Sequence, residues 1–262
     1  LAKFGAVATL ENFCQHVSSR WLMELLAENR LKSLMQPIVH SSSKEVYAYE
    51  FLLRGLTREG EEIPAPVMFK AGGDAGASYL LDLAAGEHAL QSAEHYGVKQ
   101  KVFVNVLPST LTGEDGLDGW LEVMKTASPS LLRNLVFEVV ESERFVSHEQ
   151  LITLKKTLNS QGIEVALDDF GTGFNNLSTL TEVQPDYIKL DKSLVWGLKH
   201  DARKWNMVAN IVDAAKQAQV KVIGEGVEDM ETAAALVSIG VDFLQGYYFG
   251  YPKEGPLGFD GF

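Results

Sequence analysis

The chain has 262 residues, of which 46% are hydrophobic, so it can bury one sizeable core in a single domain. Its single cysteine, Cys14, excludes an internal disulfide and is typical of a reducing, cytoplasmic compartment. The formal net charge of −12 opposes general binding to DNA or RNA polymers, because such binding needs lysine and arginine to neutralise phosphates.

The sequence shows no pattern typical of a membrane span. It has no uninterrupted run of about 18 apolar residues, and no basic segment leads into a short apolar stretch. We therefore expect this domain to make no membrane contact. Because the chain begins at Leu1 rather than Met, we keep open a longer protein with sensory or membrane-bound regions upstream.

The first predicted element is an amphipathic helix from about Thr9 to Lys32, which we take as a region of its own, residues 1–32, before a barrel at residues 33–262. Its apolar residues recur at helical spacing and would cover one end of the barrel. A role in dimerisation or signalling stays open. The apolar positions are Leu10, Phe13, Val17, Trp21, Leu22, Leu25 and Leu26.

Short β-rich runs then alternate with longer helical stretches, which predicts an α/β fold. Several runs are continuously apolar, as expected for parallel strands covered on both faces. Eight such strands ringed by helices make a modified (β/α)8 barrel of the TIM type. Only Ser41 to Glu45 join the first two strands, too few residues for a crossover helix, so we expect that pair to be antiparallel. The predicted strands are Met35–His40, Val46–Leu53, Val102–Val106, Leu135–Val140, Glu164–Asp168, Asp186–Leu190, Val220–Gly224 and Asp242–Leu244.

One long connection separates the second strand from the third. From Glu59 to Ala77 the sequence is rich in glycine, proline and acidic residues, which predicts a surface excursion. A helix from Ser78 to Tyr96 follows it.

Polar residues occupy the carboxyl ends of the predicted strands, where barrels of this type carry their active sites. Several carboxylates facing one mouth would repel one another unless cations were bound. Carboxylate and amide oxygens suit hard ions, so we expect Mg²⁺ or Mn²⁺, and adjacent Asp168 and Asp169 could bridge two ions. The polar strand-end residues are Glu50, Arg54, Asn105, Glu138, Glu141, Asp168, Asp169, Lys189, Asp191, Glu225 and Gln245.

Each of these residues taken alone has a simpler explanation. A single glutamate at a strand end is usually solvated, and the Asp-Asp-Phe-Gly run at Asp168 could be a turn that caps a helix. Asp-Phe-Gly also occurs in protein kinases, but the glycine-rich loop and His-Arg-Asp run of kinases are missing here, so we discard that interpretation. The combination across most of the strands is what indicates a site.

Eight sequence segments in order resemble one known family, the EAL-domain cyclic di-GMP phosphodiesterases. The similarity runs from about Gln36 to Pro252, and eight ordered motifs are far more specific than any one of them. The segments are QPIV at Gln36, EFLLR at Glu50, VNVLP around Asn105, FEVVES around Glu138, DDFGTGF from Asp168, PDYIKLD from Pro185, GEGVE from Gly224 and QGYYFGYP from Gln245.

The resemblance implies a role for each matching residue. Two metal ions would be held by Glu50, Asn105, Glu138, Asp168 and Asp169. Catalytic roles fall to Lys189, Glu225 and Asp169, with Glu225 as a ligand or water-positioning base. Gln36, Arg54 and Gln245 would contact the substrate. Glu141 would anchor the loop after Asp169.

The same resemblance predicts the reaction: hydrolysis of cyclic di-GMP to linear pGpG by a metal-activated water, with two Mg²⁺ or Mn²⁺ ions. A homodimer is expected, and the loop containing Gly171, Thr172 and Gly173 would couple metal binding to dimerisation. Phe249, Tyr251 and Pro252 could pack against a base, or could be core or lid residues.

Several positions depart from the family pattern. Phe51 replaces the alanine of the signature triplet and should point toward the helices, away from Glu50. Leu107 replaces a frequent serine, an acidic residue is missing around Gly72 and Gly73, and Phe174-Asn175-Asn176 replaces Tyr-Ser-Ser. Two alternatives therefore stay open: a catalytically weak receptor for cyclic di-GMP, and a barrel enzyme for metal-assisted enolisation.

Overall fold

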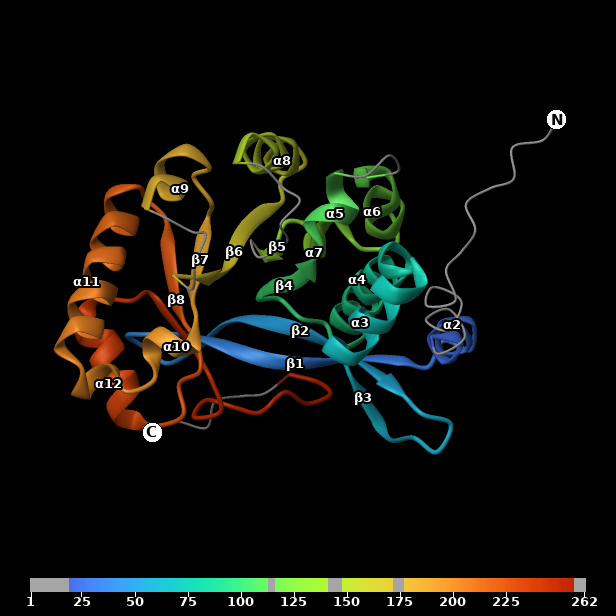
Figure 1. Cartoon of the computed structure of the whole chain (residues 1–262), viewed down its shortest axis with the longest axis horizontal. Helices are drawn as coiled ribbons and strands as arrows, with labels where there is room; N and C mark the ends of the chain where they lie inside the picture. Colours follow the sequence, from blue (N-terminus) through green and yellow to red (C-terminus); the bar gives the residue numbers. More distant parts are fainter. Residues whose placement is uncertain (1–18, 113–115, 141–147, 172–176, 257–262) are drawn as a thin grey trace.

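The computed structural model describes residues 19–112, 116–140, 148–171 and 177–256 (Figure 1). Several sequence predictions lie outside these residues and keep the status of predictions. They concern Cys14, the part of the N-terminal helix before Ser19, Glu141 and the segment 172–176.

The described strands form one closed barrel, which confirms the predicted α/β fold of the TIM type. The sheet order is β1-β9-β8-β7-β6-β5-β4-β2-β3, and β1 also pairs with β2, so the barrel closes with β3 as an appendage on β2. β1 is antiparallel to both β2 and β9, while the pairs from β2–β4 to β8–β9 are parallel. The strands are β1 (Leu31–His40), β2 (Val46–Leu56), β3 (Glu62–Pro64), β4 (Lys101–Val106), β5 (Leu135–Val140), β6 (Glu164–Phe170), β7 (Tyr187–Leu190), β8 (Lys221–Gly224) and β9 (Phe243–Gln245).

Helices surround these strands on the outside of the barrel, with α4, α8 and α11 as the long ones (Figure 1). Aspartates cap three of them at the N-terminus: Asp191 accepts from the backbone of Ser193, Asp201 from that of Arg203 and Asp229 from that of Thr232. None of the described helices is long and apolar enough to cross a membrane. The helices are α2 (Arg20–Ala27), α3 (Ala65–Ala75), α4 (Ser78–His95), α5 (Pro108–Thr112), α6 (Gly116–Met124), α7 (Pro129–Leu132), α8 (His148–Ser160), α9 (Leu177–Glu182), α10 (Lys192–Val195), η1 (Leu198–His200), α11 (Ala202–Gln217) and α12 (Met230–Ile239).

The predicted N-terminal helix extends too far at its carboxyl end. α2 stops at Ala27 because Asn29 adopts the left-handed conformation, with φ of 52°, which ends a helix. β1 begins at Leu31, four residues before the predicted strand, so the boundary expected at residues 32 and 33 falls inside a strand. Leu22 and Leu25 are fully buried, as the helical spacing predicted.

The predicted surface excursion between Glu59 and Ala77 contains regular structure. β3 pairs with the end of β2, and α3 packs with Met68 fully buried against the α2 side of the barrel. The two prolines of this stretch lie at the start of α3: Pro64 is its N-cap residue and Pro66 lies in its first turn, where proline is tolerated. Gly76, with φ of 67°, ends the helix. Composition alone therefore concealed a helix with an apolar face.

Two apolar layers enclose the barrel wall. The outer layer includes Phe51, which is 3% exposed and clusters with Ala89, Leu90 and Ala93 of α4, so the substitution in the signature triplet faces the helices as predicted. The inner layer fills the barrel below its mouth, and we call it the floor. Its members are Ile38, Ala48, Phe103, Val136, Ala166, Tyr187, Ile223 and Phe243.

Candidate active site

Each of the eight barrel strands carries a polar residue two positions from its floor residue, or is followed directly by one in the case of β8. Because side chains alternate across a strand, a spacing of two points both residues to the same side, here the barrel interior. On the seven parallel strands the polar residue follows the floor residue, and on antiparallel β1 it precedes it. The polar residues are Gln36, Glu50, Asn105, Glu138, Asp168, Lys189, Glu225 and Gln245.

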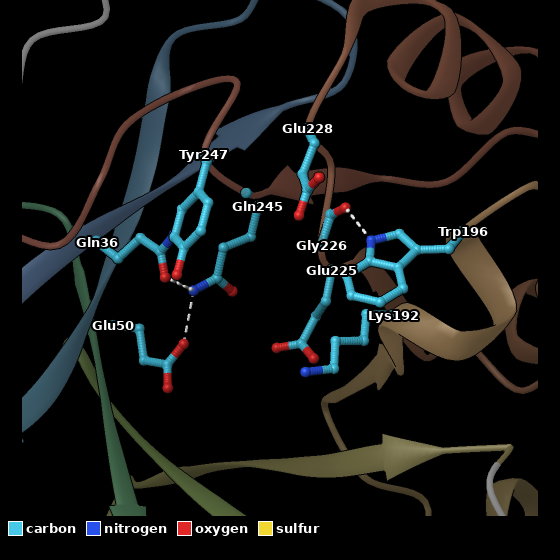
Figure 2. Close-up of a pocket in the computed structure, with 10 residues that line it drawn as sticks. Gln36, Glu50, Lys192, Trp196, Glu225, Gly226, Glu228, Gln245 and Tyr247 are labelled. Atoms are coloured by element: carbon cyan, nitrogen blue, oxygen red, sulfur yellow. Dashed lines mark hydrogen bonds between the residues drawn. The ribbon is translucent and has the colours of Figure 1, made fainter. Parts of the chain in front are cut away.

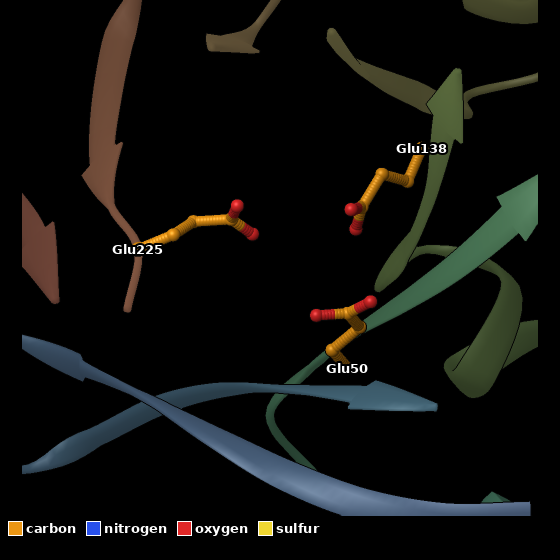
Figure 3. Close-up of side chains that lie close together, drawn as sticks. All are labelled: Glu50, Glu138 and Glu225. Atoms are coloured by element: carbon orange, nitrogen blue, oxygen red, sulfur yellow. The ribbon is translucent and has the colours of Figure 1, made fainter. Parts of the chain in front are cut away.

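Three glutamates of this set converge at the mouth of the barrel (Figure 3). Glu50, Glu138 and Glu225 each offer an oxygen, and these oxygens lie within 4.8 Å of one another. Glu138 is fully buried and Glu50 is 6% exposed. The fold thus brings together three residues that the sequence analysis assigned to one site, although they are 88 and 87 positions apart along the chain.

Lys189 lies among these acids and is 1% exposed. Its Nζ is 3.1 Å from Oε2 of Glu50, 2.6 Å from Oε1 of Glu225 and 3.9 Å from Oδ1 of Asp168, and it also contacts Oε1 of Glu138. One ammonium group therefore faces four carboxylates. The negative charges exceed the positive ones.

Burial and this charge imbalance decide the protonation of the cluster. Burial lowers the pKa of Lys189, but attraction by Glu138, Glu225 and Glu50 outweighs it and keeps the lysine charged. Burial would raise the pKa of Glu50, but the charge of Lys189 holds it below its ordinary value. Burial raises the pKa of Glu138 well above normal and that of Glu225 to about 8. The lysine thus stabilises Glu50 and leaves Glu138 and Glu225 undercompensated.

Amide side chains fix the position of Glu50. Gln245 Nε2 donates to Oε2 of Glu50 at 2.6 Å and to Oε1 of Gln36 at 3.3 Å. Asn105 Nδ2 donates to Oε1 of Glu50 at 2.9 Å. These bonds hold the predicted substrate contacts Gln36 and Gln245 next to the predicted metal ligands.

The site has unused acceptors that fit a cation. Three buried oxygens have no hydrogen-bond donor within the described part of the chain: Oε2 of Glu138, Oδ1 of Asp168 and Oε1 of Gln245. Buried acceptors are normally satisfied, so each unsatisfied one calls for a missing partner. Carboxylate and amide oxygens are the donor set of Mg²⁺ and Mn²⁺, and they fit such ions better than structural zinc.

The two adjacent aspartates lie near the end of β6, where the strand makes an irregular turn. The β6–β7 pairing shifts between Leu167 and Phe170, and Asp169 has φ of 54°. Burial and the charge of Asp168 raise the pKa of Asp169. The turn is consistent with both carboxylates serving the same mouth, although the compact acidic group itself comprises only Glu50, Glu138 and Glu225 among the described residues.

Arg54 does not join the cluster. It lies near the end of β2, where its Nη1 donates to the carbonyl of Leu53 and its Nε lies 3.7 Å from Oε2 of Glu62 on β3. Its side chain is 22% exposed. Its role in substrate binding therefore stays a prediction, and Glu62 is a partner that the sequence did not reveal.

A pocket of about 310 Å³ opens above the acids (Figure 2). Glu50, Glu225 and Gln245 form part of its wall, which connects it to the cluster. Trp196 and Tyr247, about half exposed, lie on opposite sides in Figure 2, and the Trp196 indole donates to the carbonyl of Gly226 at 3.1 Å. Besides two glycines, four lining residues were missed from the sequence. Glu228 and Tyr247 lie inside quoted motifs and Lys192 lies next to one, whereas Trp196 had no signal. The missed residues are Lys192, Trp196, Glu228 and Tyr247.

Comparison with known families matches this geometry. The family model described as "EAL domain" matches residues 19–252, which is most of the chain. The chain belongs to the EAL domain family. The match spans every strand of the barrel and every residue of the acidic cluster, so the sequence-based prediction of the family is confirmed.

Curated relatives of this EAL domain carry different names. It is 28% identical over 248 residues to cyclic di-GMP phosphodiesterase PdeF of Escherichia coli (strain K12), covering 88% of this chain and 31% of PdeF. It is 27% identical over 218 residues to the blue light- and temperature-regulated antirepressor BluF of the same organism, covering 83% of this chain and 53% of BluF. The EAL domain thus spans about a third to a half of these relatives.

Solved structures share the barrel. Klebsiella pneumoniae BlrP1, in a complex with manganese and cyclic di-GMP, aligns with a TM-score of 0.75 and 31% identity over 86% of this chain and 56% of BlrP1. The FimX EAL domain from Pseudomonas aeruginosa, bound to cyclic di-GMP, aligns with a TM-score of 0.80 and 25% identity over 90% of this chain and 97% of that one. Both neighbours were solved with the same dinucleotide.

Proposed function

We propose that this EAL domain is a phosphodiesterase that hydrolyses cyclic di-GMP to linear pGpG and requires two divalent cations, Mg²⁺ or Mn²⁺. The observation that carries the proposal is the buried acidic cluster with unsatisfied oxygens at the base of an open pocket. PdeF, which is named as an enzyme for this substrate, and BlrP1, solved with manganese and the dinucleotide, support it.

The cations would be held by Glu50, Asn105, Glu138, Asp168 and Asp169. When bound, such ions make water a better nucleophile at neutral pH and stabilise the charge that develops at phosphorus. The raised pKa of Glu138 supports this assignment, because burial and the charge of Glu50 both disfavour its ionised form and a bound cation would offset them.

The chain's own groups would orient the reactants. Lys189 lies deep in the cluster, where its ammonium group offers a donor and a positive charge to the attacking water or to a phosphate oxygen. Glu225 borders both the pocket and the cluster, so its carboxylate can orient water or take up a proton.

The pocket walls suit a flat, anionic ligand. Trp196 and Tyr247 expose aromatic faces, and Lys192 lies 5.5 Å from the centroid of the Trp196 ring and supplies local positive charge in an acidic protein. Arg54 would bind a phosphate oxygen after exchanging its ion pair with Glu62. Aromatic stacking is indifferent to which base is bound, so guanine specificity is assigned from the relatives and not from the walls.

A receptor without turnover is the second candidate, because BluF, a relative of similar identity, is named an antirepressor. In the described conformation the acidic cluster is bridged by Lys189 and Gln36 is bonded to Gln245, so binding requires some of these contacts to be exchanged.

We further propose a cytoplasmic homodimer within a longer protein.

One assay separates the two candidates. The purified domain is incubated with cyclic di-GMP and Mg²⁺ or Mn²⁺, with and without chelator, and pGpG is followed by chromatography. Glu50→Gln removes a ligand charge with little change of shape, and Glu122→Gln, an exposed glutamate on α6, is the matched control. Metal-dependent product lost only in Glu50→Gln supports the enzyme. Binding without product under both metals supports the receptor, and no binding contradicts both.

A further inference from the structure

A second buried carboxylate lies outside the acidic cluster, on α4. Asp82 is 1% exposed and accepts a hydrogen bond from the backbone N–H of Leu107 at 3.1 Å and from the indole Nε1 of Trp120 at 3.4 Å. Burying a carboxylate is unfavourable unless donors stabilise it. The backbone of Leu107 and the indole of Trp120 supply such donors to Asp82, so this carboxylate ties α4 to the end of β4 and to α6.

We propose that Asp82 is a positioning residue for Asn105, the predicted metal ligand on β4, and through it for Glu50. The inference rests on the proposed function, because it assumes that the cluster binds a divalent cation. Asp82 does not line the pocket, and it holds the Leu107 N–H from α4, outside the group of Glu50, Glu138 and Glu225. It acts by fixing the turn that follows β4.

The chain of contacts from Asp82 to the cluster is short. β4 ends at Val106, so the Leu107 N–H is the first backbone donor after the strand, two residues beyond Asn105. Asn105 Nδ2 donates to Oε1 of Glu50, which commits the amide nitrogen and leaves the amide oxygen for a cation. A carboxylate that holds the Leu107 N–H thus limits how far the end of β4 can rotate, and with it the direction of the Asn105 amide.

Asp82 is itself held in place from a second side. Trp120 of α6 is fully buried, and its ring lies against Gly86, one helical turn after Asp82 on α4. A Cβ at Gly86 would lie 2.1 Å from the Trp120 ring, so only glycine leaves room for the indole. From this position the indole N–H donates to Asp82. The Asp82 side chain is thus held by a residue of α6 as well as by its own helix, α4.

The replacement of serine by leucine at position 107 leaves this arrangement intact. The bond to Asp82 uses the backbone N–H of Leu107, which every residue except proline supplies. The alternative explanation is that Asp82 only stabilises the packing of α4 and α6. Both explanations predict a less stable protein without Asp82, so stability cannot separate them.

A comparison of Asp82→Ala with Trp120→Phe separates them. The first removes the acceptor for Leu107 and Trp120, whereas the second removes the indole bond, keeps an aromatic ring on α6 and keeps the Leu107 bond. Both should lower the urea midpoint. We expect Asp82→Ala to weaken Mn²⁺ binding at least tenfold by titration calorimetry, as mutations behind a metal ligand commonly do, and Trp120→Phe to change it less than about threefold.

A double-mutant cycle tests the route through Asn105. If Asp82 acts by positioning this residue, Asp82→Ala combined with Asn105→Ala should bind Mn²⁺ no more weakly than Asn105→Ala alone. Additive losses would overturn the proposal, and so would equal losses in Asp82→Ala and Trp120→Phe. Should Asp82→Ala not fold, Asp82→Asn replaces it, because it keeps one acceptor oxygen. Its Mn²⁺ affinity is expected to lie between that of wild type and the tenfold loss given above.

A readout in metal-free protein keeps this test independent of the proposed function. The side-chain amide signal of Asn105, identified by its loss in Asn105→Ala, should shift or broaden in the ¹H–¹⁵N spectrum of Asp82→Ala and stay in place in Trp120→Phe. If wild-type protein binds no Mn²⁺, the proposed function fails while this spectrum still decides the positioning role. An unchanged Asn105 signal in Asp82→Ala would overturn it.

Discussion

Replacing Lys189 by methionine tests the charge balance of the cluster directly. Methionine has a similar length and removes the ammonium group that faces Glu50, Glu138, Glu225 and Asp168. Removing one partner of a buried ion pair typically costs about 3–5 kcal/mol, because the remaining charge stays buried without compensation. We expect a loss of about 3 kcal/mol in the free energy of unfolding of metal-free protein near pH 7, the lower end because Glu138 and Glu225 can take up protons.

Bound cations should restore what Lys189→Met removes. In the variant, Mn²⁺ would replace the missing positive charge and would no longer be repelled by the ammonium group. Because wild type binds the ion as well, saturating Mn²⁺ changes the loss only by the difference between the two binding contributions, about 1.4 kcal/mol for a tenfold higher affinity in the variant. The loss caused by Lys189→Met should therefore shrink by about one half when chelator is exchanged for saturating Mn²⁺.

Urea unfolding with chelator and with Mn²⁺ measures both quantities, and Lys155→Met is the matched control. Lys155 is also a buried lysine, 5% exposed, and it contacts Asp186 and donates to Oδ1 of Asn159 at 2.8 Å, away from the cluster. Its replacement should cost the same in both conditions. A loss in Lys189→Met that Mn²⁺ leaves unchanged, or that matches the behaviour of Lys155→Met, would refute the reasoning.

Three further outcomes are expected. Arg54→Ala should weaken cyclic di-GMP binding about tenfold, or about 1.4 kcal/mol, and leave Mn²⁺ affinity unchanged; equal losses of both would contradict the assignment. Trp196→Ala should lower dinucleotide affinity by roughly 1–3 kcal/mol if a base stacks there, while Tyr96→Ala, an exposed aromatic away from the pocket, should have no effect. Asp229→Ala should lower the free energy of unfolding by about 1 kcal/mol, because Asp229 accepts from the N–H of Thr232 at the start of α12. That N–H lowers the pKa of Asp229 below 3.8. The charge-dependent part of the loss is therefore complete above pH 3.8 and disappears as the pH falls through the folded-state pKa. Urea titrations that give the same loss above and below this pH range would contradict the prediction.

Sequence periodicity predicted the barrel because buried parallel strands and amphipathic helices have distinct patterns. The antiparallel pairing of β1 with β2 followed from the length of their connection alone, since so few residues cannot form a crossover helix. The prediction was wrong where local chemistry competes with periodicity. Asn29 ended α2 before the predicted end at Lys32, and the composition around α3 concealed a helix whose buried face includes Met68.

The acidic cluster was predictable for the same reason that the barrel was. Once the strands are assigned, their carboxyl ends meet at one mouth, so Glu50, Glu138 and Glu225 had to converge there. The pocket walls were not predictable to the same degree. Trp196 follows α10 in a turn whose course depends on tertiary contacts, and Glu62 reaches Arg54 only because β3 adds to the barrel. Contacts between loops leave no periodic signal in a sequence.

The spacing of two between floor and mouth ties the chemistry of this domain to its core. Inserting or deleting one residue between the two layers of a strand would turn that strand's polar group out toward the helices and bring a side chain from the outer face into the barrel. Strand lengths are therefore fixed in the wall of the barrel, whereas connections between the strands are free to change length. New pocket walls, partners or inputs can be built on the loops without moving any of the eight interior groups.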